Sequence, residues 1–304
     1  MIYKILIANR AEIAVRVIRA CRDLHIKSVA IFTEPDRECL HVKIADEAYR
    51  IGTDAVRGYL DVPRIIEVAK ACGADAIHPG YGFLSENYEF AKECEDAGII
   101  FIGPKADVIR KMGNKNIARY LMSKNGIPVV PGTEKLNNCT IDEIKQFAER
   151  IGYPVILKAS GGGGGRGIRV VYKEDELESS FEACKREALA FFNNDEVFME
   201  KYVVNPRHIE IQILGDNYGN IIHLCERDCS IQRRHQKIIE IAPCPSISED
   251  LRKTIGVTAI SAAKAVGYSN AGTVEFLLDD YSNFYFMEMN TRIQVEHPIT
   301  EEVV

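Results

Sequence analysis

The N-terminal third of the chain alternates between short apolar runs and longer amphipathic stretches. The apolar runs predict buried strands at residues 4–8, 28–32, 76–77 and 99–102. Between them, apolar residues recur with helical spacing, which predicts amphipathic helices at residues 10–24, 61–72 and 86–97. The apolar stripe of the first helix consists of Ile13, Ala14, Val17, Ile18 and Cys21. Strands that alternate with helices predict a parallel sheet covered by helices.

Residues typical of helix ends indicate where several of these helices begin and end. Asp61 is placed as an N-cap with Pro63 in the first turn, and Gly73 follows the end of that helix. Residues 105–125 are predicted to be helical with an interruption at Gly113, and the turn-rich stretch 126–132 predicts a domain boundary.

The middle of the chain predicts a small unit that is able to move as a lid. Its predicted helices cover residues 141–151 and 174–191, and its predicted strands cover 155–158, 169–172 and 197–201. From residue 207 onward the pattern is mostly that of strands. One exception is a predicted helix at 251–266, with Ser246 and Glu249 as a capping pair and Gly267 at its end.

Composition narrows the class of protein. Hydrophobic residues make up 46% and charged residues 27% of the chain, and the net charge of −6 excludes a dominant basic surface for nucleic acid. No apolar run approaches the roughly 18 residues of a membrane span, and the N-terminus lacks the pattern of a signal peptide. We therefore expect a cytoplasmic protein without a membrane or nucleic-acid partner.

Nine cysteines are scattered through the chain without a repeating spacing, which is typical of reduced thiols. Cys225, Cys229 and Cys244 lie near His223 and His235 in the sequence and suggest a zinc site as one reading. A single Cys-x3-Cys without a matching pair favours buried structural thiols instead.

The strongest local signal is a glycine run at 161–165 between two apolar strands, with Lys158 at the end of the first strand. Consecutive glycines expose backbone N–H groups that are able to wrap phosphate oxygens, and a lysine adds positive charge. The alternative is a flexible surface hairpin. No Gly-Lys-Ser/Thr follows, so the run is not a Walker loop.

Carboxylates near two predicted strand ends form a second signal. A hairpin at 279–283 is expected to bring Glu275, Glu288 and Asn290 onto one face of adjacent strands. Oxygen ligands of this kind suit Mg²⁺ beside a nucleotide. The alternative is a solvated outer face of an antiparallel sheet.

Two further stretches are dense in polar residues. Alternation places Arg292, Gln294 and Glu296 on one face of an extended segment, where they are suited to bind a small oxyanion and move its proton. In the run 226–237, four cations are positioned to face a polyphosphate, although a solvated face remains the default for Arg233 and Arg234. These four cations are Arg227, Arg233, Arg234 and Lys237.

Together these segments resemble those of biotin carboxylases. The resemblance is carried, in the same order along the chain, by the motifs at 7–10, 78–87, 158–167, 226–237 and 288–298. It implies an α/β fold of the ATP-grasp type. In this fold an N-terminal parallel-sheet (Rossmann-like) domain is followed by a glycine-loop lid and an α+β C-terminal part. The implied boundaries are 1–112 for the N-terminal domain, 113–130 for a helical linker, 131–203 for the lid and 204–304 for the first part of the C-terminal domain.

The resemblance also implies a role for each matching residue. ATP phosphates would be held by Lys115, Lys158, Gly164 and Gly165, and adenine by Glu200, Lys201, Tyr202 and Val203. Further nucleotide contacts would come from His208, Gln232 and His235. Mg²⁺ or Mn²⁺ would be held by Glu275, Glu288 and Asn290. Bicarbonate would be surrounded by Lys237, Arg292, Gln294 and the backbone of Val295, with Glu296 as the base.

The implied reaction is the ATP- and bicarbonate-dependent carboxylation of biotin through carboxyphosphate. Biotin would arrive on a carrier protein or domain, a carboxyltransferase would use the product, and the enzyme would be a homodimer. Ala11 departs from the glycine of many relatives. Relatives also continue well beyond a segment that matches the last residues here, so the resemblance implies a C-terminally truncated chain whose full activity is in doubt.

Two other functions remain open at this stage. One is a different ATP-grasp ligase, such as a carboxylate–amine ligase or the bicarbonate-activating half of carbamoyl phosphate synthetase. The other is a module that binds Mg-ATP without turning it over. The final carboxyl acceptor is not readable from these residues.

Overall fold

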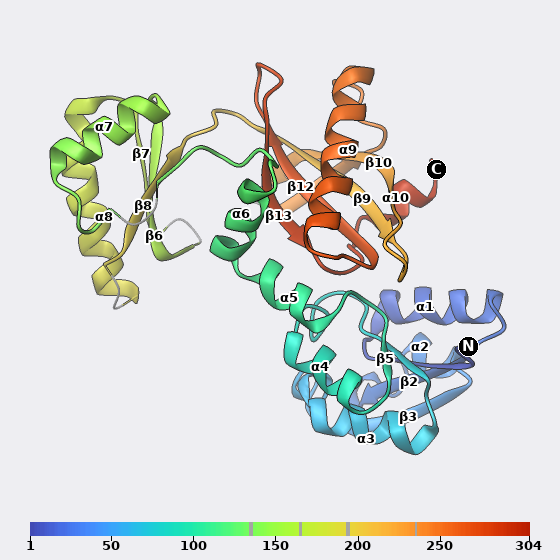
Figure 1. Cartoon of the computed structure of the whole chain (residues 1–304). Helices are drawn as coiled ribbons and strands as arrows, with labels where there is room; N and C mark the ends of the chain where they lie inside the picture. The colour runs from blue at the N-terminus through green and yellow to red at the C-terminus, as the bar shows by residue number, and fades with distance from the viewer. Residues whose placement is uncertain (134–135, 164–165, 193–194, 235) are drawn as a thin grey trace. The chain divides into compact units, whose positions relative to one another are not determined.

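The N-terminal strands form a five-stranded parallel sheet in the order β3-β2-β1-β4-β5. Four of the strands confirm the predicted ones: β1 (Lys4–Ile7), β2 (Lys27–Thr33), β4 (Ala76–His78) and β5 (Ile100–Phe101). β3 (Glu47–Gly52), an edge strand on which only Ile51 is fully buried, was not predicted. The computed structural model describes residues 1–304 apart from 134–135, 164–165, 193–194 and 235 (Figure 1).

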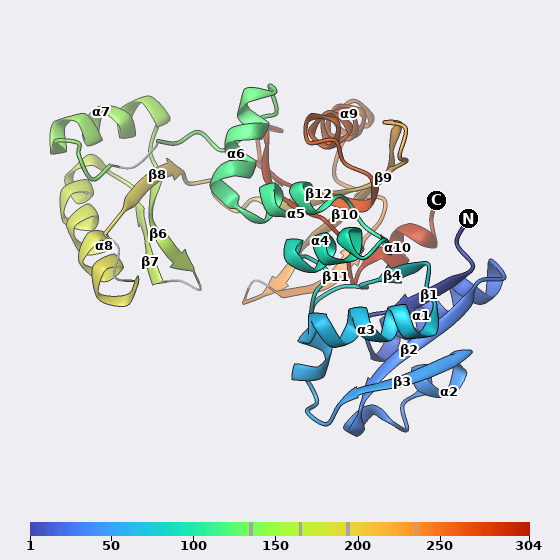
Figure 2. The ribbon, with the colours of Figure 1, turned by 60° about the horizontal axis from the view of Figure 1, so that its bottom comes forward.

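Helices cover both faces of this sheet (Figure 2). Ile5 and Ile7 of β1 pack with the predicted stripe of α1 (Ala11–Asp23). Leu6, which points to the opposite face, packs in a core with α3 (Val62–Cys72) and α4 (Tyr88–Asp96). α2 (Leu40–Ile44) is short and was not predicted. The predicted ends of α3 are confirmed, because the Asp61 side chain accepts from the N–H of Arg64 and Gly73 is left-handed at φ 67°.

The predicted break at Gly113 is also confirmed. α5 (Ala106–Gly113) and α6 (Lys115–Lys124) are separate helices, and the Asn114 side chain between them caps the second.

A separate unit contains residues 128–207 together with 277–285. Its antiparallel sheet has the order β7-β6-β8, with β6 (Val155–Gly163), β7 (Arg166–Val171) and β8 (Val197–Lys201). α7 (Ile141–Ile151) begins at a Thr140/Glu143 capping box, and α8 (Leu177–Phe192) completes the unit. Leu157, Phe181 and Met199 lie in its own apolar core.

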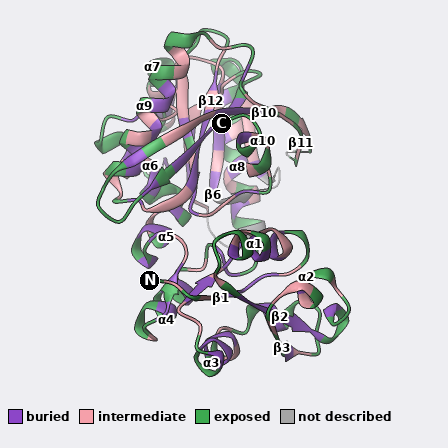
Figure 3. Ribbon diagram, turned by 90° about the vertical axis from the view of Figure 1, so that its right-hand side faces the viewer, coloured by how far each residue is buried: buried purple, intermediate pink, exposed green. Residues whose placement is uncertain are grey.

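The remaining strands form a second five-stranded sheet in the order β11-β10-β9-β12-β13. Its strands are β9 (Arg207–Gly215), β10 (Ile221–Arg233), β11 (Gln236–Ile241), β12 (Asn270–Leu278) and β13 (Phe284–Asn290). Figure 3 marks much of its interior as buried. α10 (His297–Glu301) follows the last strand. Most of this sheet belongs to one compact unit with residues 1–127.

α9 (Glu249–Ala265) packs on this sheet against β10, and the predicted capping pair is wrong. The cap is Ser248, whose hydroxyl accepts from the N–H of Leu251. Because the helix begins at Glu249, Ser246 lies too early to cap it and its hydroxyl lies 3.2 Å from the Cys244 sulfur instead. Gly267 follows the helix with a positive φ, as predicted. Among the described residues, no helix is both long and apolar enough to cross a membrane.

Candidate active site

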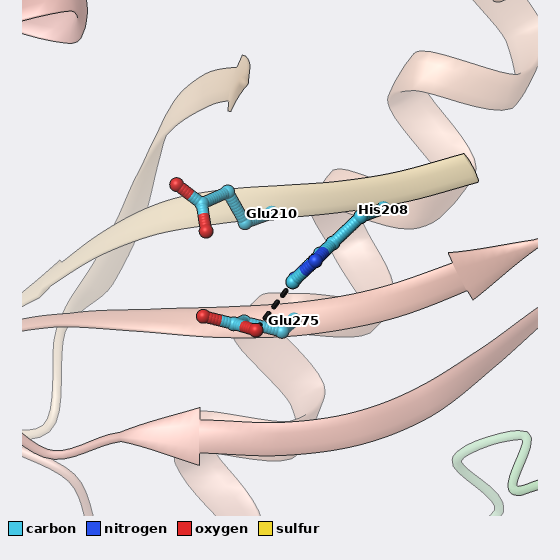
Figure 4. Close-up of side chains that lie close together, drawn as sticks. All are labelled: His208, Glu210 and Glu275. Carbon is cyan, nitrogen blue, oxygen red and sulfur yellow. Dashed lines mark hydrogen bonds and ion pairs between the residues drawn. The ribbon is translucent and has the colours of Figure 1, made fainter. Parts of the chain in front are cut away.

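The candidate site begins with alternating polar residues on a strand made otherwise of isoleucines. β9 contains His208, Glu210 and Gln212 on one face and Ile209, Ile211 and Ile213 on the other, and all six are buried. Figure 4 shows His208 and Glu210 beside Glu275 of the neighbouring strand β12. These three side chains each place a ligand atom within 4.8 Å of the others.

His208 is held in one orientation by hydrogen bonds at both ring nitrogens. Its Nδ1 lies 2.8 Å from Nε2 of Gln232, which also donates to the carbonyl of Cys229 at 2.9 Å. Since the Gln232 amide nitrogen is a donor, His208 Nδ1 accepts and His208 Nε2 carries the hydrogen. That nitrogen lies 2.5 Å from Oε2 of Glu275.

Lys237 lies at the centre of a group of carboxylates. Its Nζ is 2.5 Å from Glu210, 3.1 Å from Glu275 and 2.5 Å from Glu296. Burial alone would lower the pKa of Lys237, but the charges of Glu275 and Glu210 outweigh burial and raise it. Lys237 is therefore a permanent cation in a buried acidic environment.

The segment after β13 brings its polar side chains to the same place by a different geometry from the predicted one. Residues 291–296 form bends and a turn, so the predicted extended segment is wrong. Gln294 nevertheless lies 2.8 Å from Glu275, and Arg292 donates to Asn290 Oδ1 and to Glu86 at 3.0 Å each. Val295 is exposed.

The predicted metal residues lie on the adjacent strands β12 and β13. Asn290 Nδ2 is 2.7 Å from Glu275, and Glu288 lies two positions before Asn290 on the same face of β13. Lys115 Nζ is 3.6 Å from the Glu288 carboxylate. Glu275, Glu288 and Asn290 offer carboxylate and amide oxygens, which are the donors that Mg²⁺ prefers, so these three residues fit a divalent cation.

The prediction that Arg227 faces a polyphosphate is wrong. Arg227 is completely buried, and its guanidinium is surrounded by other side chains of the protein. Arg233 and Arg234 are exposed, which confirms a solvated face for that part of the run. The difference arises because β10 is buried from Glu226 to Cys229 and becomes exposed towards its end.

The candidate nucleotide residues of residues 128–207 form contacts within their own unit. Lys158 Nζ lies 2.5 Å from Glu200, which is on the neighbouring strand β8. Lys201 Nζ donates to the carbonyls of Gly152 and Tyr153, and burial lowers the pKa of Lys201. Tyr202 donates its N–H to the Pro154 carbonyl, and Val203 follows it. Gly164, Gly165 and His235 lie outside the described residues.

The zinc alternative is not supported. All nine cysteines are free, and Cys229 and Cys244 are buried. Where the structure describes the chain, no group with metal-ligand spacing contains two cysteines. His223 instead packs beneath Gly256 of α9.

Glu210 was not predicted as a member of the site. The available signal was the polar residue at every second position of an isoleucine-rich strand, which is the pattern of a buried polar face.

Two family models match this chain. Residues 1–109 match a family model described as biotin carboxylase, N-terminal domain, and residues 114–304 match one described as carbamoyl-phosphate synthase L chain, ATP binding domain. The first match separates this chain from the carbamoyl phosphate synthetase alternative.

Individual relatives cover the whole chain. Biotin carboxylase 1 of Bacillus subtilis is 55% identical over 100% of this chain and 68% of the relative. Biotin carboxylase of Haemophilus influenzae is 56% identical over 100% of this chain and 68% of its own length.

A solved structure adds the fold and its ligands. The biotin carboxylase domain dimer of Hydrogenobacter thermophilus 2-oxoglutarate carboxylase, in complex with MgADP, ADP and bicarbonate, superposes with a TM-score of 0.85. It is 53% identical, and the match covers 100% of this chain and 67% of that chain. The N-terminal match, the full coverage and the Lys237 site lead to one conclusion: this chain belongs to the biotin carboxylase family, whose members use ATP and bicarbonate to carboxylate biotin.

Proposed function

We propose that the group around Lys237 binds and activates bicarbonate in the ATP-dependent carboxylation of carrier-borne biotin. The observation that carries this proposal is the position of Lys237, a buried cation bonded to Glu210, Glu275 and Glu296. A cation beside several carboxylates is suited to hold a small anion that also has to give up a proton.

Bicarbonate lies, in this proposal, among Lys237, Arg292, Gln294 and the backbone of Val295. Arg292 and Gln294 each present N–H groups near Glu275 and Asn290, and a bicarbonate oxygen is able to accept from both. Glu296 then takes the bicarbonate proton, and the bicarbonate oxygen attacks the γ-phosphorus of ATP. The bond to ADP breaks, and carboxyphosphate forms.

ATP lies along the remaining predicted residues. Lys115, Lys158, Gly164 and Gly165 hold its phosphates, and the segment 200–203 receives adenine. His208, Gln232 and His235 complete the nucleotide contacts. Bound Mg²⁺ or Mn²⁺, held by Glu275, Glu288 and Asn290, supplies positive charge that offsets the charge of the transferring phosphoryl group. For Asn290 the ligand atom is Oδ1, which at present accepts from Arg292.

The proposed partners follow from the chemistry of the product. A biotin carrier protein or domain delivers biotin, and a carboxyltransferase subunit or domain consumes carboxybiotin. The related Hydrogenobacter thermophilus domain is described as a dimer, so we also propose a homodimer. The division into an N-terminal domain, linker, lid and C-terminal part remains part of this proposal.

The decisive experiment measures ADP release by the full-length protein with Mg-ATP, with and without bicarbonate and free biotin. We expect ADP release that requires bicarbonate and is stimulated by biotin. Release that ignores biotin but responds to ammonia would identify a different ATP-grasp ligase. Nucleotide binding without any bicarbonate-dependent release would identify a non-catalytic module.

A further inference from the structure

Arg227 is a completely buried side chain at the centre of the second sheet. It makes hydrogen bonds to residues of three segments besides its own strand. β9 provides Glu210 at 2.6 Å and Gln212 at 2.9 Å, and β12 provides Thr273 at 3.3 Å. The segment after β13 provides Gln294 at 2.7 Å and Thr300 at 2.8 Å.

The hydrogen bonds of Arg227 account for every N–H that a guanidinium has. Nε donates to Glu210, Nη1 donates to Gln212 and Thr300, and Nη2 donates to Thr273 and Gln294. A guanidinium carries five N–H groups in one plane, and this one is completely enclosed by the five protein acceptors, so Arg227 does not contact a ligand itself. Arg227 therefore acts on the site only through the residues that it holds.

Gln294 is the residue through which Arg227 reaches the Lys237 group. Arg227 Nη2 is a donor only, so the Gln294 atom that faces it must be Oε1. The Nε2 group of Gln294 then faces Glu275 at 2.8 Å and Glu210 at 3.4 Å. If the amide turned over, its oxygen would face two carboxylates and its nitrogen would face a guanidinium, and both contacts would be repulsive.

We propose that Arg227 is a positioning residue for bicarbonate: it fixes the Gln294 amide so that only N–H donors face the anion site. This inference rests on the proposed function, because it takes the Lys237 group as the bicarbonate site. Arg227 also holds Glu210, which bonds Lys237, so the same guanidinium supports two of the groups around the anion.

The test compares Arg227→Lys with wild type in the full-length protein, with KM for bicarbonate and KM for Mg-ATP measured separately. Lysine keeps the charge but has three donors on a single nitrogen and no planar fork. We expect KM for bicarbonate to rise roughly 10- to 100-fold, the range for loss of a hydrogen bond that involves a charged group. KM for Mg-ATP should change by less than about twofold. A general loosening of the fold would raise both constants together and would contradict the proposal.

A double-mutant cycle with Gln294→Ala tests whether Arg227 acts through Gln294. In the Gln294→Ala background, Arg227→Lys should raise KM for bicarbonate several-fold less than it does in the wild-type background, because Gln294 is absent and only the contact of Arg227 with Glu210 is left to be weakened. Effects of the two substitutions that simply multiply would overturn the proposal.

Two milder substitutions test the proposal even if the Arg227→Lys protein does not fold. Thr273→Val removes an acceptor from Nη2, the nitrogen that holds Gln294, and should raise KM for bicarbonate about threefold. Thr300→Val removes an acceptor from Nη1 and should leave that constant unchanged. Equal effects in the two variants, including no effect in either, would contradict the inference. Failure of the proposed function itself is distinguishable, because it would appear as ADP release without bicarbonate dependence in the unmodified protein.

Discussion

Glu275 illustrates how single side chains set the charge of this site. One of its oxygens accepts from Lys237, Asn290 and Gln294, and the other accepts from His208. Burial acts to raise the pKa of Glu275, but the hydrogen bond from His208 and the charge of Lys237 outweigh burial and lower it. Glu275 therefore stays ionised at neutral pH although it is buried.

Glu288 offers a cleaner test of the metal site than Glu275 does. It is partly exposed, and its contact with Lys115 is a long 3.6 Å. Glu288→Gln should therefore keep the fold but abolish bicarbonate-dependent ADP release, because an amide is a much weaker ligand for Mg²⁺ than a carboxylate. The exposed Glu178→Gln is the matched control and should retain full turnover. Unchanged turnover in Glu288→Gln would remove this residue from the metal site.

His78 makes stability depend on pH. Burial, together with the positive charges of Arg16 and His297, lowers the pKa of His78 from 6.5 to about 4. The unfolded chain takes up this proton more easily than the folded one, so the free energy of unfolding is unaffected by His78 above pH 6.5 and decreases as the pH falls towards 4. The total decrease in the free energy of unfolding is about 3 kcal/mol.

His78→Asn keeps a side-chain acceptor for the N–H of Gly80 but does not titrate. Urea unfolding at several pH values between 7 and 4 should show a shallower loss of unfolding free energy in this variant than in wild type. Identical slopes would mean that His78 does not carry this dependence.

At the scale of elements, α9 and β10 approach closely at one glycine. A Cβ added to Gly256 would lie 2.7 Å from two atoms of the His223 ring. Glycine costs about 1 kcal/mol in a helix interior, so its presence here follows from packing rather than from helix propensity.

Gly256→Ala should lower the free energy of unfolding by about 1–3 kcal/mol, because overpacking outweighs the gain in helix propensity. The exposed Val257→Ala on the same helix serves as control and should change stability little. His223→Ser should relieve the clash and restore most of the loss in the double variant. A Gly256→Ala protein as stable as wild type would show that the ring moves aside freely.

The elements that were predicted correctly carry their signals locally. α7 was predicted at its observed bounds because its apolar residues recur with helical spacing, and β8 because it begins with three consecutive apolar residues, 197–199. β3 was missed because only one of its six residues, Ile51, is fully buried and the charged Glu47 and Arg50 interrupt its apolar pattern. The cap of α9 was misplaced because two serines precede that helix. A local sequence pattern therefore predicts a helix or strand well where its apolar residues form an uninterrupted stripe or run.

The candidate site was less accessible from the sequence. Arg227 meets Glu210 across 17 positions and Thr300 across 73, and Gln294 meets Glu210 across 84. Such pairs depend on which strands become neighbours, and no local pattern contains that information. The Arg292–Glu296 group was predicted to converge, but for the wrong reason, since a turn rather than an extended strand brings it together.

At the scale of the whole molecule, the nine cysteines form no disulfide and most are enclosed. Six of them are buried, and burial raises the pKa of Cys21 and Cys184 to about 11 and that of Cys94 to about 12. Cys39, Cys139 and Cys225 are partly exposed.

At a pH of about 7.5, unperturbed thiols are already partly ionised and react with thiol reagents. Thiol titration of the native protein at this pH should therefore label at most the three partly exposed cysteines. All nine should react after unfolding in guanidinium. Rapid labelling of Cys229 or Cys244 in the native protein would show that the second sheet opens readily.

The complete pairing of Arg227 also determines which substitutions the chain is able to tolerate. Lysine supplies three donors and glutamine two, so every replacement leaves at least two of the five acceptors without a donor inside the sheet. In a library of single substitutions selected for activity, position 227 should return arginine alone. Arg233 and Arg234, exposed in the same charged run, should accept most residues, except that the positive φ of Arg234 disfavours β-branched residues and proline there. The least replaceable and the most replaceable arginines of this run thus lie within one strand and the turn that follows it.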